Sequence, residues 1–145
     1  MVASLEQGVD VRFFVAEDHA QAQGLWQSTE GLGLSEADSF ENVRRFLERN
    51  PGLSFVVTDQ QTVVATILCG HDGRRGFIHH LAVASTHRRQ GLGRVLVGRA
   101  LAALAHAGVH KCHLLVFHEN TAGRAFWERI GAERRTTLEI FSLQT

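Results

Sequence analysis

The sequence predicts an α/β protein, more closely an α+β one, with one mixed central β-sheet of about six strands flanked by about four helices. Three observations support this prediction. Apolar runs rich in β-branched residues alternate along the chain with segments whose apolar residues recur at helical spacing. The length of 145 residues corresponds to a single domain, 1–145. No internal repeat, low-complexity stretch or linker interrupts the sequence, so one layered structure is the economical interpretation.

The first half of the chain is expected to supply three strands and two helices. Residues 1–9 are expected to form a flexible lead. The elements that follow are a strand at 9–15, helices at 17–29 and 40–50, and strands at 54–59 and 62–70. Ser39 can cap the second helix, because its side chain can accept a hydrogen bond from the first turn. The triplet Asp59-Gln60-Gln61 separates the last two strands and indicates a hairpin.

The second half continues the alternation of strand and helix. The expected elements are a strand at 77–84, a helix from a glycine-rich turn to about 107, a strand at 111–117, a helix at 121–130 and a strand at 134–143. Asp72-Gly73 marks the turn that precedes the first of these strands. Gly108 and Gly131 follow the two helices, at the position where glycine commonly ends a helix. Asn120 can cap the second helix.

Composition and charge exclude several classes of protein. Lys and Arg together number 15, as do Asp and Glu, so the formal net charge is zero. This argues against a nucleic-acid partner, because such binding usually needs a basic surface. No run of roughly 18 apolar residues is present, so we expect no membrane partner. The N-terminus lacks a secretory pattern, and Cys69 and Cys112 make no disulfide framework, so we expect a cytoplasmic location.

The segment "HRRQGLGR" at 87–94 lies between an expected strand and an expected helix. A helix N-terminus offers unpaired backbone N–H groups and the positive end of the helix dipole, which together favour an anion. Gly91 and Gly93 leave the backbone open to a ligand, and three neighbouring arginines add positive charge. The segment therefore predicts a phosphate or pyrophosphate site. A plain tight turn before a buried helix is the alternative.

Two other phosphate-binding motifs do not fit this segment. A P-loop requires Lys and Ser or Thr after its second glycine, and Gly98 is followed by Arg99 and Ala100. A dinucleotide-binding fingerprint requires a third glycine, where this chain has Leu96. The predicted anion site therefore belongs to a different kind of loop.

The longer segment "LAVASTHRRQGLGRVLV" resembles the central strand, loop and helix of the GNAT acyltransferase superfamily. Within it, Arg88-x-x-Gly91-x-Gly93 matches the family pattern Q/R-x-x-G-x-G/A. Downstream, "HENTAGRAFWERIGAE" is similar to the second motif of the family, N-x-x-A-x-x-F-Y-x-x-x-G-F. The resemblance covers roughly residues 10–141 and includes the order of the elements. "CGHDGRRGFIHHLAV" also resembles a bacterial branch of the family, the YpeA-like acetyltransferases.

The resemblance implies the GNAT fold and acetyl-coenzyme A (acetyl-CoA) as the acetyl donor. It implies that backbone groups of the strand and loop bind the pantetheine arm and the pyrophosphate. It also implies that three downstream side chains lie against the pantetheine and the thiol. The complete set expected to bind the cofactor is Leu81, Ala82, Val83, Arg88, Arg89, Gln90, Gly91, Leu92, Gly93, Arg94, Asn120, Phe126 and Trp127. Asn120 has a helix cap as its alternative role, and Phe126 a place in the core.

Three histidines are candidates for catalytic groups. An amine must lose its proton before it attacks a thioester, and neutral imidazole is suited to accept it. His79 and His80 lie on one expected strand, where alternation would turn them to opposite faces, with His79 on the face of Leu81 and Val83. His118 follows the next strand.

The proton for the leaving thiolate has no obvious source in the sequence. Many family members supply it from a tyrosine, where this chain has Trp127, and the chain contains no tyrosine. The spacing of its histidines and cysteines fits no zinc pattern, so we expect no metal.

The sequence therefore predicts an N-acetyltransferase that moves the acetyl group from acetyl-CoA to a primary amine of a small molecule or peptide. The missing tyrosine leaves a second interpretation open, a non-catalytic sensor of acetyl-CoA or CoA. A third interpretation is a GNAT-fold dimer module. The last expected strand, "TTLEIF", could pair with the edge of a second copy to form a homodimer.

Overall fold

The structure is a computed structural model that describes residues 5–145. Its residues divide into two compact units, one up to Leu115 and one from Val116 on, which we describe separately. Among the described residues, the first unit holds a five-stranded sheet and three α-helices, and the second holds one α-helix. This confirms the predicted mixed sheet and the number of helices, with five strands in place of about six. The single-domain organisation stays a prediction.

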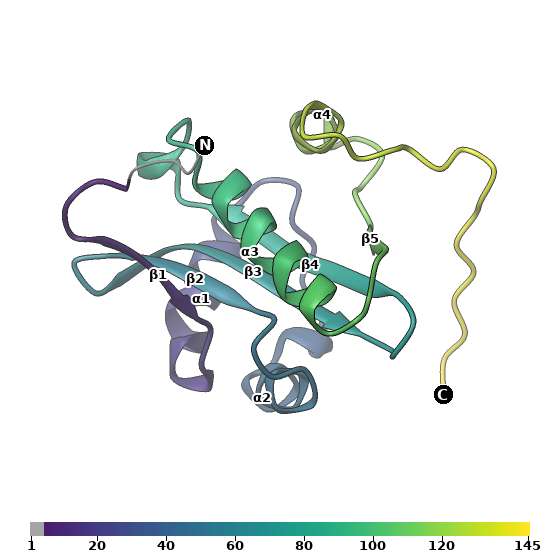
Figure 1. Cartoon of the computed structure of the whole chain (residues 1–145), viewed down its shortest axis with the longest axis horizontal. Coiled ribbons are helices and arrows are strands. Elements are labelled where there is room, and N and C mark those ends of the chain that lie inside the picture. Colours follow the sequence, from purple (N-terminus) through teal and green to yellow (C-terminus); the bar gives the residue numbers. More distant parts are fainter. Residues whose placement is uncertain (1–4) are drawn as a thin grey trace. The chain divides into compact units, whose positions relative to one another are not determined.

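The sheet has the strand order β1-β2-β3-β4-β5 (Figure 1). The strands are β1 Val9–Phe13, β2 Phe55–Asp59, β3 Thr62–His71, β4 Gly76–Val83 and β5 Cys112–Leu114, and the helices are α1 His19–Gln27, α2 Phe40–Arg49, α3 Leu92–His106 and α4 Thr121–Arg129. Strands β1 to β4 pair antiparallel, whereas β5 pairs parallel with β4. The change of direction matters for the site, because β5 reaches β4 through the α3 crossover.

Local chemistry explains where several elements begin and end. The Ser39 hydroxyl accepts a hydrogen bond from the Asn42 backbone N–H at 3.2 Å, so the predicted cap of α2 is confirmed. Gln60 and Gln61 both have positive φ, 48° and 72°, the backbone conformation that a two-residue hairpin between β2 and β3 requires. Gly108 follows α3 with a φ of 84°, which confirms the predicted stop.

The predicted strand at 134–143 is not formed. Residues 132–145 contain no helix or strand, although Leu138 and Ile140 keep the alternation that suggested one. A strand is stable only when a neighbour takes its backbone hydrogen bonds, and this segment has no such neighbour within the described residues. The strand expected at 111–117 is also shorter and ends at Leu114.

The prediction that residues 1–9 form a flexible lead is wrong for its last residues, Gly8 and Val9. Residues 1–4 of the lead lie outside the described residues. Val9 opens β1 and is buried, and the Gln60 backbone N–H donates a hydrogen bond to the Gly8 carbonyl at 3.0 Å. The chain is therefore tied to the β2–β3 hairpin before the expected end of the lead.

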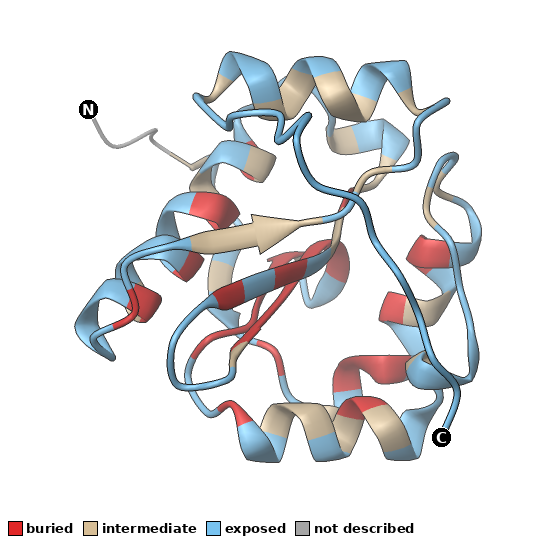
Figure 2. Ribbon diagram, turned by 90° about the vertical axis from the view of Figure 1, so that its right-hand side faces the viewer, coloured by how far each residue is buried: buried red, intermediate tan, exposed pale blue. Residues whose placement is uncertain are grey.

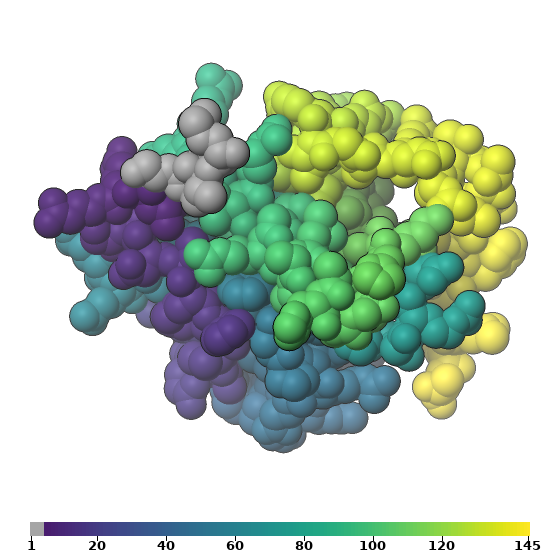
Figure 3. All heavy atoms as spheres, viewed as in Figure 1, coloured from purple at the N-terminus to yellow at the C-terminus, as the bar shows by residue number. Residues whose placement is uncertain are grey.

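Helices cover both faces of the sheet. Trp26 of α1 and Val43 of α2 are buried in one cluster with Val56 of β2 and Leu68 of β3. On the other face, α3 packs against the strands, and the space-filling view shows its side chains covering the sheet (Figure 3). Buried residues gather on the strands and on the inner sides of these helices (Figure 2). The two layers hold β4, on which the site is built, in a fixed position.

Candidate functional site

β4 is paired with β5 over only part of its length. The parallel pairing covers Gly76 to Ile78, and from His79 to Val83 the edge of β4 has no strand partner on that side within the described residues. The Ala84 backbone N–H donates to the Val64 carbonyl, so by strand alternation the backbone groups of Leu81 and Val83 point away from β3. An extended ligand can therefore add to this free edge as a further strand would.

A β-bulge at His80 shapes this edge. Leu68 of β3 pairs with His79 and Thr66 pairs with Ala82, so two β4 residues stand opposite the one β3 residue between them. His80 adopts a φ of 49°, a left-handed conformation that costs a non-glycine residue free energy. Tertiary hydrogen bonds hold it there. The Trp26 indole Nε1 donates to Thr66 Oγ1 at 2.9 Å, and the Thr66 hydroxyl donates to the His80 carbonyl at 2.9 Å.

The bulge overturns the expectation that His79 and His80 face opposite ways. Both side chains line the same cavity, and each packs against a helix of the same layer. The His79 ring lies 6.0 Å from Phe46 of α2, and the His80 ring lies 4.7 Å from Trp26 of α1, between ring centroids. The extra residue of a bulge resets side-chain alternation, and the expected face shared by His79 and Leu81 is lost with it.

The glycine loop, which we define as residues 88–94, connects β4 to α3. None of its backbone N–H groups donates a hydrogen bond within the part of the chain that the structure describes. Gly91 stands at the N-cap of α3 with a φ of 80°, and Arg89 also has a positive φ, 63°. Free N–H groups at the start of a 15-residue helix are suited to bind an anion, and the anion site itself stays a prediction.

Some side chains of the glycine loop are held by the protein, and others are exposed and charged. Leu92 is buried, so only its backbone is available to a ligand. The Arg88 side chain reaches back, and its Nε donates to the Val83 carbonyl at 3.1 Å. Arg89 and Arg94 are exposed and form no ion pair among the described residues. Two of the three arginines are therefore free to meet a phosphate.

His87 connects the start of this loop to the β2–β3 hairpin. Its Nε2 contacts Asp59 Oδ2 at 2.7 Å, and its Nδ1 contacts Thr86 Oγ1 at 2.7 Å. Asp59 ends β2, so the contact joins segments 28 residues apart in the sequence. The sequence analysis missed this anchor, because nothing in "VTDQQ" marks Asp59 as more than a turn residue.

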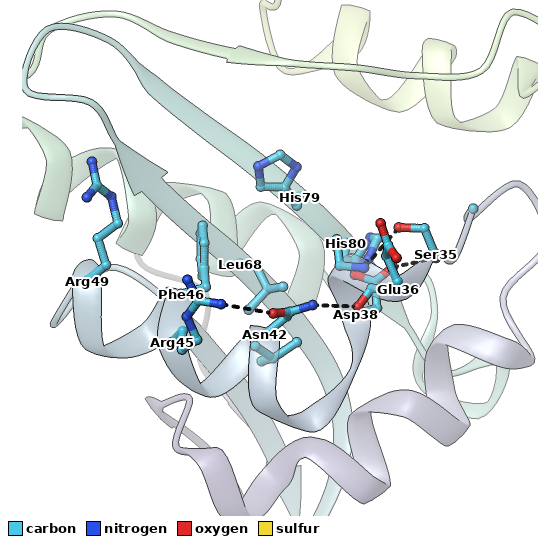
Figure 4. A pocket seen from close by; sticks show the side chains of 13 residues that line it. Ser35, Glu36, Asp38, Asn42, Arg45, Phe46, Arg49, Leu68, His79 and His80 are labelled. Carbon is cyan, nitrogen blue, oxygen red and sulfur yellow. Dashed lines mark hydrogen bonds and ion pairs between the residues drawn. The ribbon is translucent and has the colours of Figure 1, made fainter. Parts of the chain in front are cut away.

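A cavity of about 680 Å³ lies between α2, the α1–α2 connection and β4; we call it the α2 cavity. Figure 4 shows side chains from these segments around it. The residues that line it are Gly33, Ser35, Glu36, Ala37, Asp38, Asn42, Val43, Arg45, Phe46, Arg49, Leu68, His79 and His80. It therefore combines apolar walls with carboxylates, guanidinium groups and imidazoles, as ligand sites commonly do.

Asp38 holds His80 in the wall of this cavity. Its Oδ1 lies 2.6 Å from His80 Nε2, and its Oδ2 accepts a hydrogen bond from the Ser35 backbone N–H at 2.9 Å. Both side chains are largely buried, 15% exposed for His80 and 13% for Asp38. The pair joins the α1–α2 connection to the bulge of β4, so it sets the shape of the cavity.

His79 has a different environment from its neighbour. Its ring centroid lies 6.0 Å from that of Phe46 and 6.3 Å from that of Phe77, and the residue is exposed and lines the cavity. Desolvation lowers the pKa of His79 below its ordinary 6.5, and His80 lowers it further, against the opposing effect of Asp38. The His79 side chain forms no hydrogen bond within the described residues. Its imidazole is therefore mainly neutral at neutral pH, with one nitrogen able to accept a proton and the other able to donate.

The remaining expected site residues lie in the second unit, which is described by itself. Asn120 caps α4, because its Oδ1 accepts a hydrogen bond from the Gly123 backbone N–H at 2.9 Å. The rings of Phe126 and Trp127 meet edge to face, with centroids 5.2 Å apart. His118 is exposed, and its carbonyl accepts a hydrogen bond from Arg124. The cap interpretation of Asn120 is confirmed, and the cofactor roles of these residues stay predictions.

Sequence reasoning missed most of the α2 cavity. The sequence analysis did not name four of its lining residues, Asp38, Asn42, Arg45 and Arg49. Arg45 and Arg49 stand at helical spacing on the face of α2 that also presents Asn42. This spacing does not identify a site unless it is known that the same face borders β4. The pairing of Asp38 with His80 spans 42 residues and left no trace in the sequence.

No group of three or more His, Cys, Asp or Glu side chains in residues 5–145 is placed to hold a metal ion. Within the same residues, no helix has the length and apolar character needed to cross a membrane.

Comparison with known proteins gives one family. A model of the acetyltransferase (GNAT) family matches residues 19–132. A protein of Yersinia pestis (strain Pestoides F) named acetyltransferase is 26% identical over 132 residues, which cover 91% of this chain and 93% of that protein. The range that the family model matches includes β4, the glycine loop and α4.

Solved structures agree on the fold. An acetyltransferase from Streptococcus agalactiae superposes with a TM-score of 0.76 at 16% identity and covers 97% of this chain and 93% of that one. AAC(6')-Iy in complex with the bisubstrate analog CoA-S-monomethyl-acetylneamine superposes with a TM-score of 0.74 at 14% identity, with 94% and 99% covered. At these identities the likeness shows the fold, and the predicted mixed α+β architecture is confirmed.

Proposed function

Because this chain belongs to the acetyltransferase (GNAT) family, we propose that it transfers the acetyl group of acetyl-CoA to a primary amine held in the α2 cavity. One observation carries the proposal. The free edge of β4, from His79 to Val83, connects the unpaired N–H groups of the glycine loop with the wall of the α2 cavity. A ligand that is anionic at one end and extended at the other suits this path.

The chain's own backbone would hold the donor. N–H groups of the glycine loop suit the pyrophosphate, with the guanidinium groups of Arg89 and Arg94 beside them. The outward backbone groups of Leu81 and Val83 suit the amide groups of the pantetheine arm, whereas the backbone groups of Ala82 face β3. The remaining expected contacts, from Asn120, Phe126 and Trp127, stay part of the proposal.

His79 is the residue we assign as the base. An alkyl ammonium group has a pKa near 10, so it must give up a proton before it attacks. The His79 imidazole is mainly neutral at neutral pH, forms no hydrogen bond within the described residues and borders the cavity next to the free edge. It accepts that proton directly or through a water, while the amine nitrogen forms a bond to the acetyl carbon and the carbon–sulfur bond breaks. His80 contacts Asp38 and forms part of the wall of the α2 cavity.

The thiolate that leaves then needs a proton. Trp127 cannot supply it, because an indole N–H is no practical acid. A thiol has a pKa near 8.5, so the thiolate leaves without full protonation and takes a proton from water or from the imidazolium of His79. General acid help is typically worth about 10²–10⁴ in rate, so its absence slows the reaction without abolishing it.

The test of the donor site is a calorimetric titration with acetyl-CoA. We expect micromolar binding to the wild type and none to Gly91→Trp, because the space beside the Gly91 Cα is open and the indole would fill it where the pyrophosphate is expected. Gly73→Trp is the matched control, since Gly73 also has a positive φ, 94°, and equally open surroundings but lies in the β3–β4 turn. Thermal denaturation of both variants separates a lost site from a lost fold.

Turnover then separates an enzyme from a sensor. Both bind acetyl-CoA, but only an enzyme releases free CoA thiol faster when an amine is added. Binding without amine-dependent release by any amine would favour the sensor. No binding to the folded wild type would contradict both and leave the structural dimer module.

We also propose a cytoplasmic location, as the sequence analysis expects.

We also propose a homodimer through the C-terminal segment. Ile140 and Phe141 are 67% and 88% exposed, and they lie in an extended stretch with Leu138 and Leu143. An extended apolar segment is suited to pair with a strand edge of a second copy. Sedimentation should show a dimer for the wild type and a monomer for Ile140→Asp, and a monomeric wild type would overturn this proposal.

A further inference from the structure

α2 presents its arginines in two different ways, and the difference bears on the acceptor. Arg44 is ion-paired with Glu41 and Glu48 of the same helix. Arg45 and Arg49 are four residues apart, on one face of the helix, and both line the α2 cavity. Neither forms an ion pair with a carboxylate within the described residues. Arg45 Nη1 donates to Asn42 Oδ1 at 3.5 Å, so two guanidinium groups without an ion pair border the same cavity.

The other end of the cavity carries the opposite charge. Glu36 and Asp38 come from the α1–α2 connection, and Figure 4 shows them beside His80 at one end, with Arg49 at the other and His79 between. Asp38 contacts His80, while Glu36 forms no ion pair among the described residues. The cavity thus has an acidic end next to the imidazoles and a basic end on α2.

We propose that the acceptor is a small primary amine that also carries a carboxylate, an inference that rests on the proposed acetyltransferase function. Glu36 and Asp38 attract the ammonium group and bring it to His79. The guanidinium groups of Arg45 and Arg49 bind the carboxylate, for which their planar donor geometry is suited. A polyamine would place a second positive charge against the arginines, and like charges disfavour binding.

The helix limits the spacing between the two groups of the acceptor. A helix rises about 1.5 Å per residue, so Arg49 lies roughly 6 Å beyond Arg45 along the axis of α2. Amino acids of increasing chain length therefore bring the carboxylate to one arginine or to both. The dependence of binding on chain length reports which arginine is used.

The test compares amines that differ only in the carboxylate. Glycine, β-alanine, γ-aminobutyrate and ε-aminocaproate are each compared with their own amides, and putrescine serves as the polyamine. CoA release from acetyl-CoA and calorimetric binding to the CoA-loaded protein are both measured. We expect the best acid to exceed its amide at least about tenfold in kcat/KM and in affinity, the value of a charge-assisted hydrogen bond.

Variants of α2 make the test specific. Arg45→Gln and Arg49→Gln should reduce the preference for the acid, and the double variant should remove it. Arg44→Gln is the matched control, since Arg44 lies on the same helix in ion pairs of its own and should leave the preference unchanged.

The outcomes distinguish a failure of the carboxylate inference from a failure of the proposed acetyltransferase function. Equal use of acids and amides, or a preference for putrescine, would overturn the carboxylate inference while leaving an acetyltransferase. Preferential binding of an acid without any CoA release would support the inference and contradict the proposed function. If no acid is either bound or acetylated, the inference is overturned.

Discussion

The glycine loop and the α2 cavity are the two halves of the proposed site, and they are built in opposite ways. The loop is one continuous segment, 88–94, that offers backbone N–H groups. The cavity is assembled from side chains of the α1–α2 connection, α2, β3 and β4. A backbone site depends on conformation, whereas a side-chain site depends on the identity of each residue. Conservative substitutions should therefore affect the cavity more than the loop.

The largest expected effect is in the cavity. His79→Gln should lower kcat about 10²–10⁴-fold, because it removes the proposed base while keeping a polar side chain. Affinity for acetyl-CoA should stay unchanged, as measured by calorimetry. The pH dependence is a second readout. The wild-type rate should rise with pH through a pKa below 6.5, since His79 acts when neutral, and the variant should lose that rise.

His110→Gln is the control for this variant, since His110 is exposed and does not line the cavity. An unchanged kcat in His79→Gln would remove His79 from the mechanism. It would direct attention to His80, whose Nε2 is already engaged by Asp38.

The second effect tests how far the loop depends on side chains. Replacing Arg89 and Arg94 together by Gln should raise the Kd for acetyl-CoA about tenfold at low salt, and less at high salt, because exposed charges are screened. Gly91→Trp should have a much larger effect. Arg99→Gln on the exposed side of α3 is the control. A loss of binding in the double Gln variant as complete as in Gly91→Trp would mean that the loop binds through charge and not through its backbone.

A smaller effect is expected where the loop is anchored. Asp59→Asn weakens the contact of Asp59 with His87 and should raise the Kd for acetyl-CoA roughly two- to tenfold, the value of one hydrogen bond. Asp72→Asn is the control, because Asp72 plays a comparable part in the other hairpin, where it accepts from Arg74 and Arg75. A Kd equal to wild type would show that the loop keeps its shape without this anchor.

The smallest effect concerns stability. Folding lowers the pKa of His79, so between the folded pKa and 6.5 the unfolded chain binds more protons at this residue than the folded chain. Stability from this group is therefore complete above pH 6.5 and falls as pH drops through that window. His79→Gln has no such titration. Its urea midpoint should fall less steeply on acidification than that of the wild type, and parallel curves would contradict the lowered pKa.

Much of the fold was predictable because its signals are local. Ser39 caps α2, Gln60 and Gln61 turn a hairpin, and Gly108 ends α3 through interactions within a few residues of each position. The strand predicted at 134–143 failed for the complementary reason. Alternation shows that a segment can form a strand, but a strand needs a partner, and partners are a property of the tertiary structure.

The sequence by itself determined the family resemblance and the order of the elements up to α4, and it predicted the anion site of the glycine loop. All three depend on contiguous residues, whose chemistry can be recognised before folding. Only the tertiary structure decided that His79 and His80 face one cavity, because the bulge between them is held by Trp26 and Thr66 from other elements. It also brought Asp38 to His80 across 42 residues. Side-chain sites are built from such long-range contacts, which a linear pattern does not record.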